Sequence, residues 1–163
     1  MKPLMTIVAG LIAISGLNAQ TKEQIENLSD RLESAWKTKS HQAFDALYCK
    51  DNADQFQIDQ NVDSWVWKMS NYPKLKIVRF LNISELEKLA DPQNGNSEQD
   101  RYREILGRIT KPQVMNGHSY VQNLPAVGIL DYNITRNGLT GVHSVAVGLN
   151  PDGRLQFTLQ RRS

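Results

Sequence analysis

Apolar residues in the first half of the chain recur every three or four positions, which is the pattern of amphipathic helices. Three helices are predicted: one over about residues 22–37, a short one that Ser40 caps, and one that Pro73 ends. Their apolar faces comprise Ile25, Leu28, Leu32, Ala35 and Trp36 in the first, Ala43, Phe44, Leu47 and Tyr48 in the second, and Val62, Trp65, Val66, Met69 and Tyr72 in the third.

The pattern changes after Pro73. Residues 75–83 are rich in β-branched and aromatic side chains and predict a strand. Two pairs have the spacing of a helix capping box: Thr21 with Gln24 at the first helix, and Ser84 with Glu87 at a short helix that reaches residue 90. A turn-rich loop and one more helix, capped by Ser97, follow, and the remainder of the chain is strand-like.

Two tight turns determine how the C-terminal strands pair. Asn137-Gly138 favours a two-residue type I′ turn, which places Tyr132 opposite His143. Residues 150–153 (NPDG) favour a three-residue hairpin loop. The second hairpin is predicted to pair Leu149 with Leu155, Val147 with Phe157, Val145 with Leu159, and His143 with Arg161.

The two registers agree on which side of the sheet is buried. Because side chains alternate along a strand, a slip of one residue would mix the two sets. The face predicted to lie against the helices carries Leu130, Val145, Val147, Leu149, Leu155, Phe157 and Leu159, and the opposite face carries Asp131, Ser144, Ala146, Gln156, Thr158 and Gln160. Val127 and Ile129 lie on that opposite face, which is expected to be partly buried.

The N-terminus has the features of an export signal. Met1-Lys2-Pro3 is followed by an uncharged, mainly apolar run of 14 residues, 4–17, which is shorter than the roughly 20 residues of a membrane span. We therefore expect a signal peptide over residues 1–19, cleaved near Ala19, and a single α+β domain over residues 20–163. An uncleaved membrane anchor is the alternative. The expected location is the bacterial periplasm or the outside of the cell.

Composition excludes several classes of protein. The 19 Lys and Arg residues nearly balance 17 Asp and Glu residues, and removal of Lys2 leaves 18 against 17, a net charge of about +1, so neither nucleic acid nor an anionic membrane is an expected partner. Cys49, the single cysteine, allows no internal disulfide and is interpreted as a buried apolar residue. No metal-binding or nucleotide-binding motif is present, and no cofactor is expected.

The order of elements resembles a known superfamily. A helix, a short helix ending in residues 46–51 (ALYCKD), a third helix and then an antiparallel sheet resemble the nuclear-transport-factor-2-like, or SnoaL-like, superfamily. Residues 120–128 (YVQNLPAVG) resemble a strand of uncharacterised exported bacterial proteins of this type. The resemblance implies an α+β fold in which N-terminal helices pack on a curved antiparallel sheet, forming a cystatin-like cone with a funnel. In enzymes of the superfamily the funnel holds an Asp or His base, but no motif here assigns one.

Tyr132, His143 and Arg161 form the candidate site, because the predicted register places them side by side at one end of the apolar face. An imidazole and a phenol can exchange protons with a ligand, and a guanidinium can bind a carboxylate or phosphate. The alternative is a sheet end that frays into solvent. Trp67 lies off its helical face and is a further candidate contact. Asp131 points to the opposite face, so a pairing of Asp131 with His143 is not expected.

Three functions are compatible with these features. The leading hypothesis is an exported binding or accessory module for a small apolar or anionic ligand. The second is an isomerase, dehydratase or cyclase with His143 as the base and Tyr132 as the proton donor. The third is a homodimerisation module that uses Val127, Ile129 and Ala146 on the outer face of the sheet.

Overall fold

The computed structural model describes residues 19–91 and 97–163. Residues 1–18 of the predicted signal peptide, and most of the predicted loop at 91–96, lie outside these ranges. No helix within them combines the length and the hydropathy that crossing a lipid bilayer requires.

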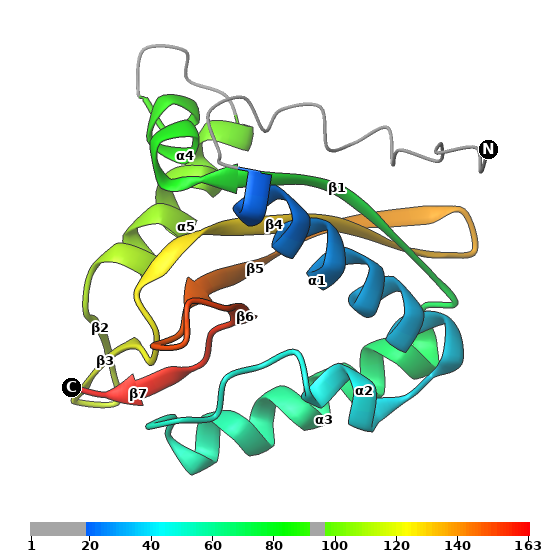
Figure 1. Cartoon of the computed structure of the whole chain (residues 1–163), viewed down its shortest axis with the longest axis horizontal. Helices are drawn as coiled ribbons and strands as arrows, with labels where there is room; N and C mark the ends of the chain where they lie inside the picture. Colours follow the sequence, from blue (N-terminus) through cyan, green and yellow to red (C-terminus); the bar gives the residue numbers. More distant parts are fainter. Residues whose placement is uncertain (1–18, 92–96) are drawn as a thin grey trace.

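The chain has the predicted α+β organisation, with three helices, a strand, two more helices and then antiparallel strands (Figure 1). The helices are α1 (Ala19–Thr38), α2 (His41–Asp45), α3 (Gln55–Asn71), α4 (Ile83–Leu89) and α5 (Ser97–Thr110). The strands are β1 (Lys74–Asn82), β2 (Gln113–Met115), β3 (His118–Gln122), β4 (Ala126–Arg136), β5 (Leu139–Leu149), β6 (Leu155–Phe157) and β7 (Gln160–Arg162).

Two antiparallel sheets form from these strands. The larger sheet has the order β1-β4-β5-β6, and the smaller has the order β2-β3-β7. The long hairpin of β4 and β5 is the centre of the larger sheet. The smaller sheet lies at the end of the molecule that holds the C-terminus (Figure 1).

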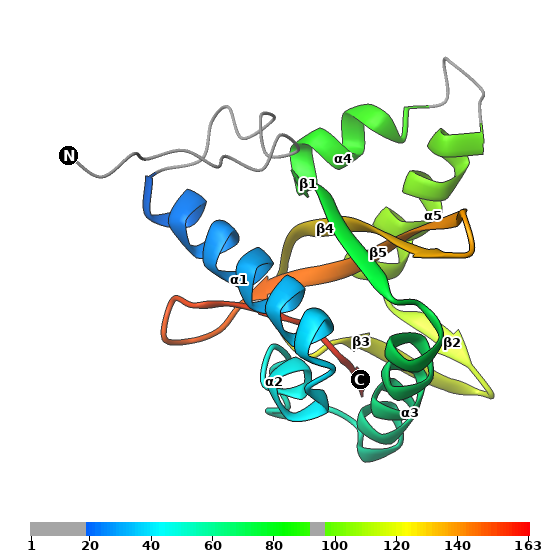
Figure 2. The same ribbon diagram turned by 90° about the vertical axis from the view of Figure 1, so that its right-hand side faces the viewer.

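Helices cover both faces of the larger sheet (Figure 2). On one face, buried residues of α1, α2 and α3 pack with Leu130, Tyr132 and Val147 in the main hydrophobic core. On the other face, Ile129 and Leu81 pack with α4 and α5 in a second core. Ile129 is therefore fully buried, and the outer surface that was predicted to support a homodimer is not open at this residue.

The predicted register is confirmed for the first hairpin. Tyr132 pairs with His143 and Leu130 with Val145, and both Asn137 and Gly138 have the positive φ angles of a type I′ turn. In the second hairpin, Leu149 pairs with Leu155 and Val147 with Phe157, as predicted. Leu149 is the exception to the predicted burial, because its side chain is 42% exposed.

The predicted continuation of the second hairpin is wrong. β6 ends at Phe157, and the following strand, β7, pairs with β3, where Arg161 lies opposite Val121. The chain leaves β5 because Leu159 is hydrogen-bonded to Asn123 instead. The backbone amide of Asn123 donates to the Leu159 carbonyl at 2.8 Å, and the side-chain oxygen of Asn123 accepts from the Leu159 amide at 2.8 Å.

Both predicted capping boxes are also wrong in detail. At α4 the box consists of Asn82 and Glu85, two residues before the predicted pair. At α1 the helix already includes Thr21, and the Gln24 side chain instead bonds to the β5–β6 hairpin, accepting from the Leu155 amide at 2.8 Å and donating to the Gly153 carbonyl at 3.1 Å. Gln24 thus joins α1 to the sheet.

Candidate functional site

A cleft of about 450 Å³ opens at the edge of β5, just before the point where β6 begins to pair with it. This volume lies within the range of small-molecule sites. α3 contributes one wall and α5 another, and residues 143–146 of β5 lie between them. The lining also includes the amide side chains Gln57, Gln60, Asn61, Gln122 and Gln160.

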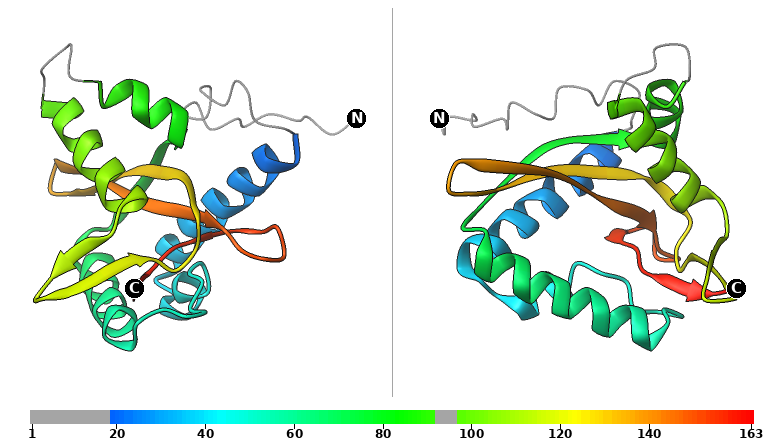
Figure 3. Two further views of the ribbon diagram at one scale, coloured as in Figure 1. Left: turned by 90° about the vertical axis from the view of Figure 1, so that its left-hand side faces the viewer. Right: turned by 180° about the vertical axis from the view of Figure 1, so that it is seen from behind.

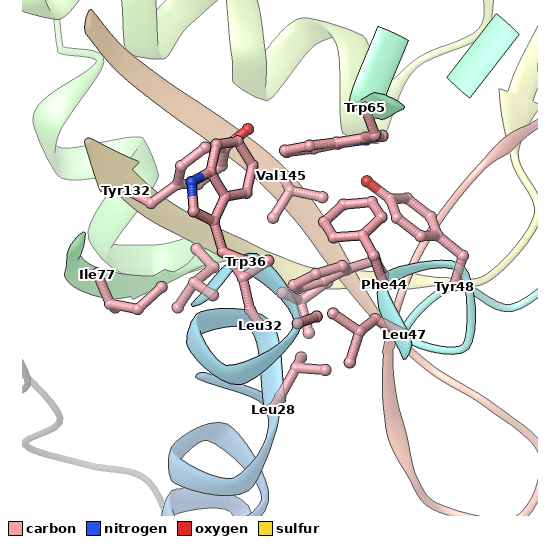
Figure 4. Close-up of a cluster of buried hydrophobic side chains, with 14 of the residues drawn as sticks. Leu28, Leu32, Trp36, Phe44, Leu47, Tyr48, Trp65, Ile77, Tyr132 and Val145 are labelled. Carbon is pink, nitrogen blue, oxygen red and sulfur yellow. The ribbon is translucent and has the colours of Figure 1, made fainter. Parts of the chain in front are cut away.

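Three aromatic residues of the main core reach the cleft: Tyr48, Trp65 and Tyr132. The Trp65 and Tyr132 ring centroids are 5.8 Å apart, and Figure 4 shows the two rings side by side above the helix that carries Trp36. They are held in place because Trp65 also packs at 4.1 Å on Phe44 and donates its Nε1–H to Asn61 at 3.0 Å. The site therefore has a rigid aromatic base.

Burial changes the acidity of the Tyr132 phenol in this base. Tyr132 is 1% exposed and lines the cleft. Burial raises the pKa of this phenol well above its ordinary value of 10, and the nearby Tyr48 raises it further. Tyr132 is thus a neutral phenol at a position that lines the cleft, and its hydroxyl is able to donate a hydrogen bond.

His143 stacks on Tyr132, as the predicted register requires. The two ring centroids are 5.7 Å apart with the planes inclined by 20°. Burial lowers the pKa of His143 below its ordinary value of 6.5, and the charges of Lys68 and Arg101 lower it further. His143 is therefore neutral at neutral pH, and its imidazole can accept a proton from a ligand.

Lys68 brings the positive charge of α3 to the cleft. Its ammonium lies 4.6 Å from the centroid of the Trp65 ring, which is a cation–π contact, and burial lowers its pKa below 10.5. Lys68 makes no ion pair with any carboxylate in the described part of the chain. Arg108 supplies a second cation, and among the described residues neither Asp nor Glu lines the cleft.

Two of the four predicted site residues lie elsewhere. Arg161 is exposed on β7, which the right panel of Figure 3 shows at the opposite end of the molecule from the β4–β5 turn. Trp67 is 57% exposed and packs against Tyr72 at 5.9 Å, and it does not line the cleft. Tyr132 and His143 are the two predicted residues that the structure brings together in the cleft.

Asp131 occupies the far side of the sheet from His143, as predicted, in a second polar cluster. Its carboxylate accepts from Tyr102 Oη at 2.7 Å, from Arg101 Nη2 at 3.1 Å, from Arg79 Nε at 3.4 Å, and from Ser144 Oγ. Arg101 also donates to Ser144. Asp131 is 1% exposed, so this charge is compensated entirely within the protein. Ser144, which lines the cleft, belongs to this network.

The sequence analysis did not assign several cleft residues to a site, among them Lys68, Trp65, Arg108 and the amides of α3. Helix α3 begins seven residues before the first predicted face residue, Val62, because the Asp54 side chain accepts from the Phe56 amide at 3.0 Å and caps the helix. An Asp followed by helix-forming residues is a visible cap signal. A helix predicted to start at this cap would have placed Gln57, Gln60 and Lys68 on the same side of α3, which is the side that lines the cleft.

Fold and site together define an α+β protein with a cationic, aromatic-floored cleft at an open sheet edge. Comparison with protein-family models, with curated proteins and with solved structures finds no match to this chain. In the two described ranges, no three His, Cys, Asp or Glu side chains are grouped so that they could hold a metal ion.

Proposed function

We propose that the chain is an exported binding module whose cleft takes a small organic anion with an apolar or aromatic body. The observation that carries the proposal is the composition of the cleft wall, in which Lys68, Arg108 and neutral His143 surround an aromatic base without a carboxylate among the described residues. Lys68 is partly removed from water and makes no ion pair with a carboxylate of the described residues, and such a cation favours an anionic ligand, since the ligand restores the lost interactions.

Tyr132 gives the proposed site a second means of recognition. Its hydroxyl can donate to a ligand oxygen that enters the cleft, while Trp65 contacts the apolar part of the same molecule. We also propose that the protein belongs to the nuclear-transport-factor-2-like superfamily and that its sheet is cone-shaped. The order of helices followed by antiparallel strands supports this placement. Export to the periplasm after cleavage near Ala19 is likewise proposed from the sequence of the leader.

Binding of 3-phenylpropionate tests the proposal, with the uncharged 3-phenylpropionamide as the matched probe. We expect calorimetry to show that the carboxylate binds about tenfold or more tightly than the amide, and that added salt weakens this binding. Lys68→Met should weaken carboxylate binding, whereas Lys88→Met, a change of an exposed lysine on α4, should leave it unchanged. Equal binding of the two probes, or no binding of either, would contradict the proposal.

A proton-transferring enzyme is the second candidate, and the neutral His143 stacked on the neutral phenol of Tyr132 favours it. His143 would accept a proton from the carbon next to a ketone, and Tyr132 would donate a hydrogen bond to the enolate oxygen that forms. Exchange of the benzylic protons of phenylacetone in heavy water, followed by NMR, measures this step. The protein should exceed the buffer rate and His143→Gln should not, and identical rates would remove this function.

A further inference from the structure

Among the described strands, none pairs with one half of β5 on the side that faces the cleft. β5 lies between β4 and β6, but β6 pairs with residues 147–149 alone. The Thr158 amide then donates to the Ala146 carbonyl at 3.0 Å, and beyond this point the chain turns away to β3. Residues 139–145 of β5 therefore pair with β4 on one side and present an unpaired edge on the other.

The register shows which backbone groups point outward. In an antiparallel hairpin with a two-residue turn, Leu139, Gly141, His143 and Val145 exchange hydrogen bonds with β4. The groups of Thr140, Val142 and Ser144 must then face away, and the bond from Thr158 to Ala146 has the same parity. No residue in the described ranges bonds to the outward amides or carbonyls of these three positions.

This edge also lacks the features that normally prevent strand pairing. Charged side chains, prolines and bulges protect most exposed edges. Residues 139–146 (LTGVHSVA) contain no Lys, Arg, Asp, Glu or Pro, and Leu139 and Val142 are exposed. The opposite edge of the same sheet, β1, has Lys74 and Lys76 and an irregularity between Ile77 and Arg79. The contrast singles out β5 as an edge that is suited to pairing.

The unpaired edge leads directly into the cleft, because His143, Ser144 and Val145 belong to both. A strand added to β5 would run between the edge and the cationic wall, with Lys68 on α3 and Arg108 on α5. The surroundings are positively charged and, among described lining residues, free of carboxylates. Charge complementarity therefore selects an acidic occupant over a second copy of this chain, which would bring the same cations together.

We propose that the natural ligand is an extended acidic peptide, whose main chain pairs with Thr140, Val142 and Ser144 and whose carboxylate lies beside Lys68. Strand addition gives affinity through main-chain hydrogen bonds, and the cleft supplies selection for the side chain. The inference rests on the proposed function, since it names the class of anion that the same cleft binds.

Binding of acetyl-Thr-Val-Glu-Val-Thr-amide to the mature protein tests the inference, with 3-phenylpropionate measured in parallel. Two further peptides carry N-methyl groups, one on the second and fourth residues and the other on the first, third and fifth. Because alternate amides of a strand point to opposite sides, we expect one of these two peptides to lose binding by about tenfold or more and the other to retain it. Replacement of the Glu by Gln should also weaken binding.

Val142→Pro provides the matched change in the protein. The Val142 amide does not bond to β4, so proline at this position removes an outward donor and leaves the ladder to β4 intact. It should weaken the peptide while leaving 3-phenylpropionate unchanged, and Val142→Thr, which keeps the amide, should alter neither. If Val142→Pro does not fold, the two N-methylated peptides still test the strand pairing with the unaltered protein.

The outcomes separate the two proposals. Binding of 3-phenylpropionate without binding of any peptide would overturn the strand pairing and leave the anion site standing. Equal binding of all the N-methylated peptides would also overturn it, as would a dimer of the protein that Val142→Pro converts to monomer. Failure of both probes would remove the anion site as well.

Discussion

The ionisable residues of the cleft differ from the other buried ionisable residues in that no charge of opposite sign in the described ranges compensates them. His143 and Lys68 both lose part of their hydration there, and both have lowered pKa values. On the other face of the sheet, Asp131 is more deeply buried but is matched by Arg79 and Arg101. Lys68, a cation without a carboxylate partner in the described part of the chain, is costly for the fold, and this cost is recovered when an anion binds beside it.

His143 predicts how stability depends on pH. Because its pKa in the folded protein is below the ordinary value of 6.5, the unfolded chain takes up the proton first as the pH falls. Above about pH 6.5, where His143 is neutral in both states, it does not make the free energy of unfolding depend on pH. Below that pH the unfolded chain is protonated first, and the free energy of unfolding decreases. Urea denaturation at about pH 7.5 and about pH 5.5 should show a smaller loss for His143→Gln than for the unaltered protein. The exposed His118, changed to Gln, is the control and should not reduce the loss.

Asp131 predicts a large loss of stability on removal of one charge. Asp131→Asn would leave Arg79 and Arg101 without their shared carboxylate. We expect the free energy of unfolding to fall by about 2–4 kcal/mol, somewhat below the range for fully buried pairs, because both guanidinium groups are partly exposed. Asp100→Asn removes an exposed ion pair with Arg103 and should cost about 0.5 kcal/mol or less. Similar losses for the two variants would contradict the role assigned to Asp131.

Strands β1 and β4 of the larger sheet pack so closely that Gly128 has no room for a side chain. A Cβ atom at Gly128 would lie 2.2 Å from the Leu81 carbonyl oxygen and 2.7 Å from Phe80 Cζ. Gly128→Ala should therefore separate β4 from β1 and cost about 3 kcal/mol. Thermal and urea denaturation measure this loss.

Gly107 is the matched control for this prediction. It lies within α5, and apart from its chain neighbours and the nearby backbone of α5, no atom of the described residues lies within 4 Å of the place that a Cβ would take. Gly107→Ala should raise the free energy of unfolding by about 0.5–1 kcal/mol, since alanine has less conformational freedom to lose in a helix. A destabilised Gly107→Ala, or a Gly128→Ala of unchanged stability, would show that the packing of these elements is described incorrectly.

Local chemistry explains which elements could be predicted from the sequence. The register of Tyr132 and His143 followed from a turn whose residue types allow one geometry, Asn137-Gly138. The position of Arg161 did not follow, because the end of β6 depends on Asn123, which lies 36 residues away from Leu159 in the chain. Lys68 was missed for a similar reason, since its role depends on α3 lying across from β5, which no local pattern encodes.

At the scale of the whole molecule, hydrogen bonds of Asn123 connect segments that are far apart in the chain. Asn123 follows β3 of the smaller sheet and precedes β4 of the larger one. Besides its two bonds to Leu159, its side-chain amide donates to the Cys49 carbonyl at 2.7 Å and to the Asp51 carbonyl at 3.1 Å. One residue of the β3–β4 connection therefore holds the β6–β7 segment and the loop before α3 together. The β6–β7 segment also forms part of the cleft wall, through Thr158, Leu159 and Gln160.

Asn123→Ala should consequently loosen both attachments at once. The substitution removes three side-chain hydrogen bonds and leaves the Leu159 amide and the Cys49 and Asp51 carbonyls without their partner. We expect the free energy of unfolding to fall by about 2–4 kcal/mol, measured by urea denaturation, and hydrogen exchange to quicken in residues 49–54 and 157–162 before it does in β4. Asn27→Ala, a change on the exposed side of α1, should have almost no effect. If exchange quickened equally in β4, the two sheets would be unfolding as one unit, and Asn123 would not be the joint between them.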